Sequence, residues 1–270
     1  MTSAASPEME TLKSRLKTMW EAGDFSKVAQ HIEQAATDFV GRLDIRPGMK
    51  VLDVACGSGN LAVLAAEKGA AVTGIDIAEN LVNTAKRRAA KTGLEIKFEQ
   101  GDAESMPYGD DTFDVVMSMF GAMFCPRPDV TASEMIRVCK PGGTIAMANW
   151  TADGFAGQMF KLSGKYMPPP DMPPPVLWGD PAVVRERFDG VADVKTSERM
   201  AEMTYEFSPE GVVEFFKTYF GPTVMTFKTI AEEDYEALTD DMVELWSANN
   251  QATDGTTRVL GEYLEVIAVK

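Results

Sequence analysis

Histidine and cysteine are scarce in this chain. The 270 residues contain one histidine, His31, and three cysteines, Cys56, Cys125 and Cys139. The cysteines are odd in number and follow no metal-binding spacing, so the sequence predicts neither a disulfide framework nor a metal site. Free thiols suit a reducing compartment, and we expect a cytoplasmic protein.

Long apolar runs and positive charge are also lacking. No run of about 18 apolar residues is present, so we expect no membrane-spanning helix, and Met1 to Glu10 lacks the apolar core of a signal peptide. Lys and Arg number 26 against 41 Asp and Glu, a formal net charge of -15. Because such a field repels phosphate backbones and anionic lipids, we expect no nucleic-acid or membrane partner.

One short stretch, KVLDVACGSGNLA over residues 50–62, organises the chain. Its apolar first half predicts a buried strand, and the residues after Asn60 change to helical spacing. Between them, Gly57 is expected to allow a sharp turn and Gly59 to let a ligand approach the backbone. Free N–H groups at the start of the following helix would face that ligand.

Further predicted strands end in turns and acidic residues. The strand over 71–75 is followed by Asp76, an acid about 20 residues past the glycine turn, which suits the two hydroxyls of a ribose. Helices at about 58–68, 78–92 and 129–139 alternate with the strands, which predicts a parallel sheet with helices on both faces and a ligand at the carboxyl ends of the strands. The later strands are expected over 96–98, 113–118 and 144–148.

Five motifs in this order resemble those of the class I S-adenosylmethionine (SAM) methyltransferases: Asp53-Val54-Ala55-Cys56-Gly57-Ser58-Gly59, Gly74-Ile75-Asp76, Gly101-Asp102-Ala103, Phe113-Asp114-Val115-Val116 and Lys140-Pro141-Gly142-Gly143. The similarity covers roughly residues 20–150 and is nearest to the small-molecule enzymes of the ubiquinone and menaquinone biosynthesis type. It implies an α/β, Rossmann-like, seven-stranded and mostly parallel sheet whose last strand is antiparallel. It also implies SAM as cofactor and S-adenosylhomocysteine as product.

Residues 1–270 are expected to form one methyltransferase domain in three parts. Residues 1–45 would form an N-terminal helical lid, with a helix from about 27 to 43 and Ser26 as its N-cap. Residues 46–150 would form the SAM-binding core. Residues 151–270 would hold cap inserts and the last two strands, including an extended segment with six prolines in 168–175, helices over 210–220 and 232–249, and strands within 191–205 and 258–269. A homodimer is compatible with this sequence.

The resemblance assigns the parts of SAM to matching positions of the chain. The N–H groups of the glycine turn suit the carboxylate, Asp53 suits the ammonium, and Asp76 suits the ribose. The expected cofactor-binding residues are Phe25, Asp53, Ala55, Cys56, Gly57, Gly59, Asp76, Ile77, Asp102, Ala103, Ser118 and Met119.

No residue is assigned as the catalytic base. Methyl transfer is an in-line displacement at an activated carbon, so much of the catalysis can come from positioning and desolvation. A base is needed only if the acceptor must lose a proton. His31 is a candidate by residue type, but a lone histidine on a helix is more often a packing or surface residue, and we favour that interpretation.

The methyl acceptor is expected to be a small, mainly apolar or aromatic molecule beneath a cap built from about 155–180 and 208–250. The expected substrate-binding residues are Phe120, Met123, Phe124, Trp150, Trp178, Phe216 and Tyr219. For Phe215, Phe216 and Tyr219, a stripe in a helix core is an equally good interpretation.

Two other functions are compatible with the sequence. An NAD-dependent oxidoreductase shares the fold and the ribose acid, although Asp53 would repel a pyrophosphate and attract an ammonium. A non-catalytic SAM-binding protein is the second alternative, because a fold does not fix a function.

Overall fold

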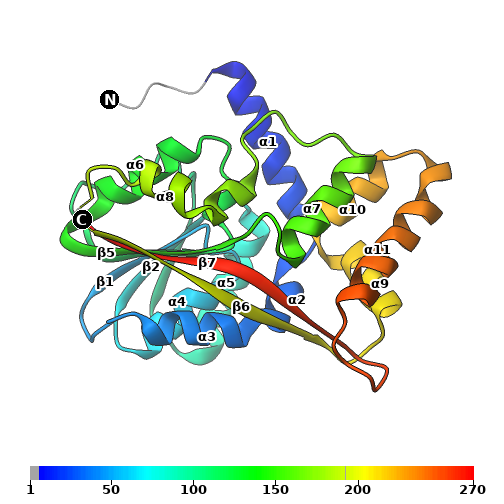
Figure 1. The fold of residues 1–270 in the computed structure, drawn as a ribbon. Coiled ribbons are helices and arrows are strands. Elements are labelled where there is room, and N and C mark those ends of the chain that lie inside the picture. The colour runs from blue at the N-terminus through cyan, green and yellow to red at the C-terminus, as the bar shows by residue number, and fades with distance from the viewer. Residues whose placement is uncertain (1–5, 192) are drawn as a thin grey trace.

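A twisted seven-stranded sheet forms the centre of the molecule in the computed structural model, which describes residues 6–191 and 193–270 (Figure 1). The strand order is β3-β2-β1-β4-β5-β7-β6. Only β7 runs antiparallel to its neighbours, β5 and β6. The Rossmann-like fold predicted from the sequence, with its antiparallel last strand, is therefore confirmed. The strands are β1 Lys50–Val54, β2 Ala71–Asp76, β3 Ile96–Gln100, β4 Phe113–Met119, β5 Cys139–Trp150, β6 Asp193–Tyr205 and β7 Thr257–Val269.

The central strands are apolar on both sides because helices cover both faces of the sheet. Val51, Leu52 and Val54 of β1 are completely buried, as a strand inside a parallel sheet requires. Figure 1 shows α3 and α4 below the sheet and α6 and α8 above it. Three helices follow strands of the core: α4 Asn60–Glu67 after β1, α5 Glu79–Thr92 after β2 and α6 Pro128–Val138 after β4. The helix α3 Glu33–Arg42 precedes β1, and α8 Pro181–Arg187 lies between β5 and β6.

The N-terminal helices differ in detail from the prediction. The expected helix over 27–43 is divided into α2 Phe25–Ala29, a 3-10 turn over Gln30–Ile32, and α3. The N-cap of α2 is Asp24 and not Ser26, because the Asp24 carboxylate accepts hydrogen bonds from the Ser26 amide at 3.1 Å and from its hydroxyl. Before it, α1 Pro7–Glu21 is capped by Ser6.

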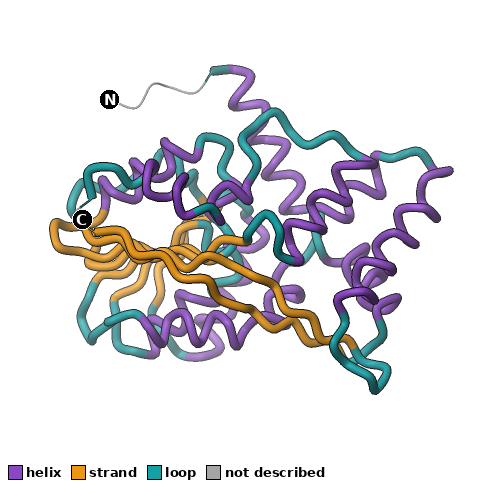
Figure 2. Tube along the Cα trace, viewed as in Figure 1, coloured by secondary structure: helices purple, strands orange, loops and turns teal. Residues whose placement is uncertain are grey.

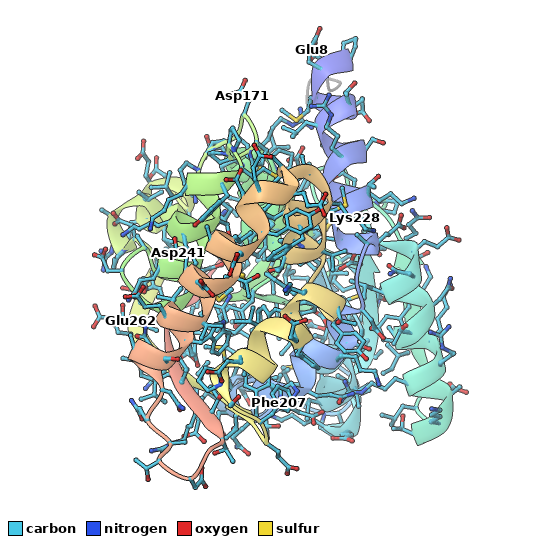
Figure 3. The ribbon with its side chains drawn as sticks, turned by 90° about the vertical axis from the view of Figure 1, so that its right-hand side faces the viewer. Glu8, Asp171, Phe207, Lys228, Asp241 and Glu262 are labelled. Atoms are coloured by element: carbon cyan, nitrogen blue, oxygen red, sulfur yellow. The ribbon has the colours of Figure 1, made fainter. Side chains whose placement is uncertain are left out.

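The chain after β5 adds a layer of helices at one end of the sheet, beside α1 (Figures 1 and 2). The helices are α7 Phe155–Tyr166, α9 Pro209–Tyr219, α10 Gly221–Thr229 and α11 Tyr235–Asn249. Figure 3 views this end directly, with α9, α10 and α11 toward the reader. The sequence did not predict α7 or α10. The proline segment has no strand, as expected, and ends in a 3-10 turn over Pro175–Gly179.

The helices of this layer share a hydrophobic core separate from that of the sheet. Val212, Phe216 and Trp246 are buried there against Phe155 and Tyr205. Tyr205 belongs to β6, so the long hairpin of β6 and β7 carries the sheet into the helical layer. Among the described residues, no helix combines the length and the apolar character that a membrane crossing requires.

Candidate cofactor and acceptor site

A cavity opens at the carboxyl ends of β1, β2 and β4, where the prediction placed the ligand. Its floor is the loop after β1, its sides are the loops after β2 and β3, and α1 and α2 cover it. Ten of the twelve predicted cofactor residues line it: Phe25, Asp53, Ala55, Cys56, Gly57, Asp76, Ile77, Asp102, Ala103 and Met119. The structure therefore brings nearly all of the motif residues to one place.

The two glycines of the turn have different surroundings. Both have a positive φ, +51° at Gly57 and +79° at Gly59. A Cβ atom at Gly57 would meet no protein atom within 4 Å, whereas one at Gly59 would lie 2.8 Å from Cζ of Phe98. Gly57 thus leaves the backbone open to a ligand, while Gly59 makes room for a buried ring of β3. The predicted role of Gly59 in ligand approach is therefore replaced by a packing role.

Most N–H groups of the turn are already bonded within the protein. Cys56 donates to the carbonyl of Ile75, and Gly59 donates to the carbonyl of Cys56. Gly57 donates to Oδ2 of Asp76 at 2.8 Å. At the turn and the start of α4, the N–H groups of Ser58, Asn60 and Leu61 have no partner among the described residues. These groups are the ones available to an anionic ligand, a narrower set than the sequence suggested.

Asp53 lies at the end of β1 with only 1% of its surface exposed. Its Oδ2 accepts a hydrogen bond from the Ala62 amide at 3.0 Å, and no cation pairs with it among the described residues. Burial raises the pKa of Asp53 well above its ordinary value, and the nearby charge of Asp76 acts in the same direction. A buried carboxylate without a counter-ion is a site for a ligand cation.

Asp76 ends β2 and is fixed by the backbone on both sides. Its Oδ2 accepts from Gly57, and its Oδ1 accepts from the Ala78 amide at 2.8 Å. Burial raises its pKa, and these two hydrogen bonds oppose the rise. The side chain is thus held in one orientation at the cavity wall, joining the glycine turn to the start of α5.

Lys13 of α1 reaches into the cavity and pairs with the loop after β3. Its Nζ lies 2.5 Å from Oδ2 of Asp102 and 2.7 Å from Oε2 of Glu104, and its side chain is 7% exposed. Glu104, which is fully buried, also pairs with Arg127 at 2.7 Å. Sequence reasoning missed Lys13, although it shares a helical stripe with Leu16 and Trp20, which also line the cavity.

A second cavity adjoins the first on the side of the helical layer. Its wall is aromatic and aliphatic, from Trp20, Phe25, Val28, Ile32, Phe120, Phe124, Trp150, Phe155, Ala156, Met159, Phe160, Met203, Tyr205, Phe216 and Phe220. Five of these side chains also line the first cavity: Trp20, Phe25, Ile32, Phe120 and Phe124. The two cavities therefore meet at a shared apolar border formed by these five side chains.

Phe120 is held at this wall in a strained conformation. Its φ is +55°, which is rare for a bulky residue, and its ring stacks on Trp150 with centroids 3.6 Å apart. The next residue, Gly121, packs so tightly that a Cβ there would lie 2.5 Å from the carbonyl oxygen of Ala55. The end of β4 is thus pressed against the turn after β1, and strain of this kind is typical of functional sites.

Some predicted site residues lie outside both cavities. Trp178 is 1% exposed and packs beside Phe188 under the guanidinium of Arg187, 4.4 Å away. Met123 is buried in the core of the sheet, and Tyr219 packs on Phe215 at the edge of the helical core.

Ser118 and His31 also have structural roles. The Ser118 hydroxyl donates to the Val54 carbonyl and accepts from the Ala122 amide, so it joins β4 to β1. His31 donates from Nδ1 to the Thr204 carbonyl at 2.6 Å and stacks on Tyr205 with centroids 4.1 Å apart. It lines neither cavity, in agreement with the packing interpretation.

Comparison with known proteins gives the family. Residues 51–143 match a family model described as a methyltransferase domain. An uncharacterized protein of Mycobacterium tuberculosis is 36% identical over 269 residues, covering 97% of this chain and 97% of that protein. The methyltransferase GfsG of Streptomyces halstedii is 37% identical over 130 residues, which cover 47% of each chain.

A solved structure agrees in fold. A putative methyltransferase from Bacillus halodurans has a TM-score of 0.58 at 20% sequence identity, covering 88% of this chain and 99% of that one. The methyltransferase-domain match over residues 51–143 favours methyl transfer over the NAD-dependent oxidoreductase. With Asp53, Asp76 and an open glycine turn gathered at the strand ends, this chain belongs to the class I SAM-dependent methyltransferases.

Proposed function

We propose that this enzyme transfers the methyl group of SAM to a small, mainly apolar or aromatic acceptor held in the second cavity. One observation carries the proposal: the apolar second cavity shares a wall with the motif-lined cavity. A methyl group held at this shared border would lie next to both the cofactor and the acceptor. The shared residues Trp20, Phe25, Ile32, Phe120 and Phe124 would surround the reacting atoms.

The residues of the first cavity fit the groups of SAM. The free N–H groups of Ser58, Asn60 and Leu61 suit its carboxylate, and the buried carboxyl group of Asp53, which no described cation pairs with, suits its ammonium. Asp76 is oriented to accept from the ribose hydroxyls. Ile77 and Ala103 lie along the cavity where an adenine would continue beyond the ribose, and Lys13 holds Asp102 beside them.

The second cavity supports an apolar acceptor because the described residues of its wall include no carboxylate and no amine. Among these residues the only ionisable side chain is Tyr205, whose phenol pKa is raised by burial. An unpaired charge on the acceptor would be costly in such surroundings.

The chain's own residues contribute positioning and exclusion of water. SAM supplies a methyl group on a sulfonium, which needs no further activation. The stacked rings of Phe120 and Trp150 give the acceptor a rigid surface, and the aromatic wall keeps water from the transfer. Tyr205 stays protonated at neutral pH, so no residue of the second cavity acts as a base. The acceptor would therefore be a nucleophile that reacts without help from a protein base, or it would lose its proton to water.

The test is methyl transfer from radiolabelled SAM to a panel of phenols, quinols, amines and thiols. The matched variants are Ala156→Phe, which fills the second cavity, and Ala182→Phe, the same change at an exposed position of α8. We expect Ala156→Phe to abolish transfer and to keep SAM affinity within about threefold, measured by calorimetry, while Ala182→Phe behaves as wild type. Full transfer by Ala156→Phe would refute this acceptor site, and SAM binding without transfer to any compound would favour a non-catalytic role.

A further inference from the structure

Tyr205 is the last residue of β6, and its ring is fixed in the wall of the second cavity. His31 stacks on one side of it, and the ring of Trp246 meets it edge-on at 5.6 Å and 89°. Phe215 and Phe216 of α9 pack around it as well, just after Phe207, which Figure 3 labels at the lower end of the helical layer. A ring held from several sides places its hydroxyl at a fixed point.

The Tyr205 hydroxyl forms no hydrogen bond with the described residues, although only 2% of the residue is exposed. Three other tyrosines in the same molecule are satisfied. Tyr108 donates to Glu99 at 3.0 Å, Tyr166 donates to Asp241 at 3.0 Å, and the Tyr263 hydroxyl accepts from Arg42 at 3.0 Å. The fully buried side-chain atoms without a partner among the described residues are Asn149 Nδ2, Trp178 Nε1, Arg187 Nη1 and Trp246 Nε1. The Tyr205 hydroxyl is not one of them, so it stays accessible, and the residue lines the second cavity, where a bound molecule can pair with the hydroxyl.

The surroundings of this hydroxyl indicate what the missing partner is. Met203, Phe155 and Phe216 share the cavity wall and the hydrophobic cluster with Tyr205, and their side chains neither donate nor accept conventional hydrogen bonds. Burial raises the pKa of Tyr205, so the phenol keeps its proton at neutral pH and acts as a donor. The partner is then an acceptor atom on whatever fills the cavity.

We propose that the Tyr205 hydroxyl donates a hydrogen bond to an oxygen of the methyl acceptor and so selects and orients it. This inference rests on the proposed function, since it assumes that the acceptor occupies the second cavity. The favoured class is a flat apolar molecule with one hydrogen-bond-accepting oxygen, such as a phenol, quinol or ketone. A hydrocarbon of the same shape would fill the cavity and leave the hydroxyl unpaired. Tyr205 is a positioning residue in this scheme.

The test compares 2-naphthol with naphthalene as probes, titrated into the S-adenosylhomocysteine complex of the protein. The variants are Tyr205→Phe and, as a matched control outside the second cavity, Tyr108→Phe. For wild type and Tyr108→Phe we expect 2-naphthol to bind about tenfold more tightly than naphthalene, the value of one hydrogen bond of this kind. In Tyr205→Phe this preference should disappear, with naphthalene affinity unchanged. A preference that survives in Tyr205→Phe would overturn the proposal.

A second measurement needs no ligand. In the ligand-free protein, Tyr205→Phe removes a hydroxyl that has no hydrogen-bond partner among the described residues, and the midpoint of urea unfolding should stay the same or rise. Tyr108→Phe removes a bonded hydroxyl, and its midpoint should fall. A lower midpoint for Tyr205→Phe would show that its hydroxyl already has a protein partner and would overturn the proposal even if neither probe binds. Failure of both probes to bind wild type, with Tyr205→Phe as stable as expected, would instead refute the apolar acceptor site.

Discussion

The pair of glycines in the turn after β1 offers a sharp test, because the same substitution should act differently at each. In Gly57→Ala the new methyl group enters open space at the cavity, and in Gly59→Ala it meets Cζ of Phe98 at 2.8 Å and Cβ of Ala85 at 3.2 Å. Both positions are left-handed, so both variants pay the same backbone strain. Comparing the two variants therefore separates the effect of crowding inside the protein from the effect of contact with the ligand.

The magnitudes follow from that geometry. An alanine in the left-handed region destabilises the folded state by about 1–2 kcal/mol. Alanine also lowers the conformational entropy of the unfolded chain, which stabilises the protein by about 0.4–1 kcal/mol, so Gly57→Ala should lower the free energy of unfolding by about 1 kcal/mol. Ala55, two positions earlier, already has a φ of +54°, which shows that this turn accepts a left-handed alanine. Crowding against Phe98 adds about 1–3 kcal/mol at Gly59, for a total of about 2–4 kcal/mol.

The assays are urea unfolding of the cofactor-free protein and calorimetric titration with SAM at a temperature where all variants are folded. Gly57→Ala should weaken SAM binding by about tenfold or more while the fold persists, a change of about 1.4 kcal/mol or more. Gly59→Ala should be less stable to urea than Gly57→Ala, but the folded variant should keep most of its affinity for SAM. The reasoning fails if Gly57→Ala binds SAM like wild type, or if Gly59→Ala is as stable as Gly57→Ala.

Three further outcomes are expected. Because burial raises the pKa of Asp53, the folded cofactor-free protein holds this proton more tightly than the unfolded chain, so the stability from Asp53 is lost as pH rises through the raised pKa. SAM affinity should rise over the same range, since its ammonium favours the ionised carboxylate, and in Asp53→Asn both trends should flatten in calorimetric and unfolding titrations. Lys13→Met should cost about 2 kcal/mol, less than the ~3–5 kcal/mol of a fully broken buried pair because Glu104 keeps Arg127, and should speed tryptic cleavage after Arg15 relative to Lys17→Met. His31→Ala should keep most of the transfer rate, since His31 lines neither cavity; a thousandfold fall with SAM affinity intact would make it the base.

The sequence predicted the site best where its geometry depends on the backbone conformation of a few consecutive residues. The strand, glycine turn and helix of residues 50–62, and the acid at the end of β2, follow from short-range periodicity and from residues that few others can replace. The order and direction of the strands came from the family resemblance. The structure brings Asp53, Gly57 and Asp76 to one cavity, and their roles toward SAM stay predictions.

The sequence predicted poorly where side chains meet across the chain. The ring of Phe98, 39 positions away in the sequence, leaves no room for a side chain at residue 59. Lys13 pairs with Asp102, which is 89 positions away. Trp178 lies beneath Arg187 because the 3-10 turn packs on β5, which no periodicity reveals. Apolar composition alone does not distinguish a core residue from a cavity wall, and so Met123 was assigned to the acceptor while Met203 was not.

The shared wall between the cavities has a kinetic consequence. Trp20, Phe25 and Ile32 come from the N-terminal helices and border both cavities, so in the proposed complex one segment would cover cofactor and acceptor together. Neither molecule then exchanges independently of the other, and a single opening event precedes the departure of both products. The release of both products would accordingly share one step, and the turnover number would track the opening rate of α1 and α2 more closely than the nucleophilicity of the acceptor.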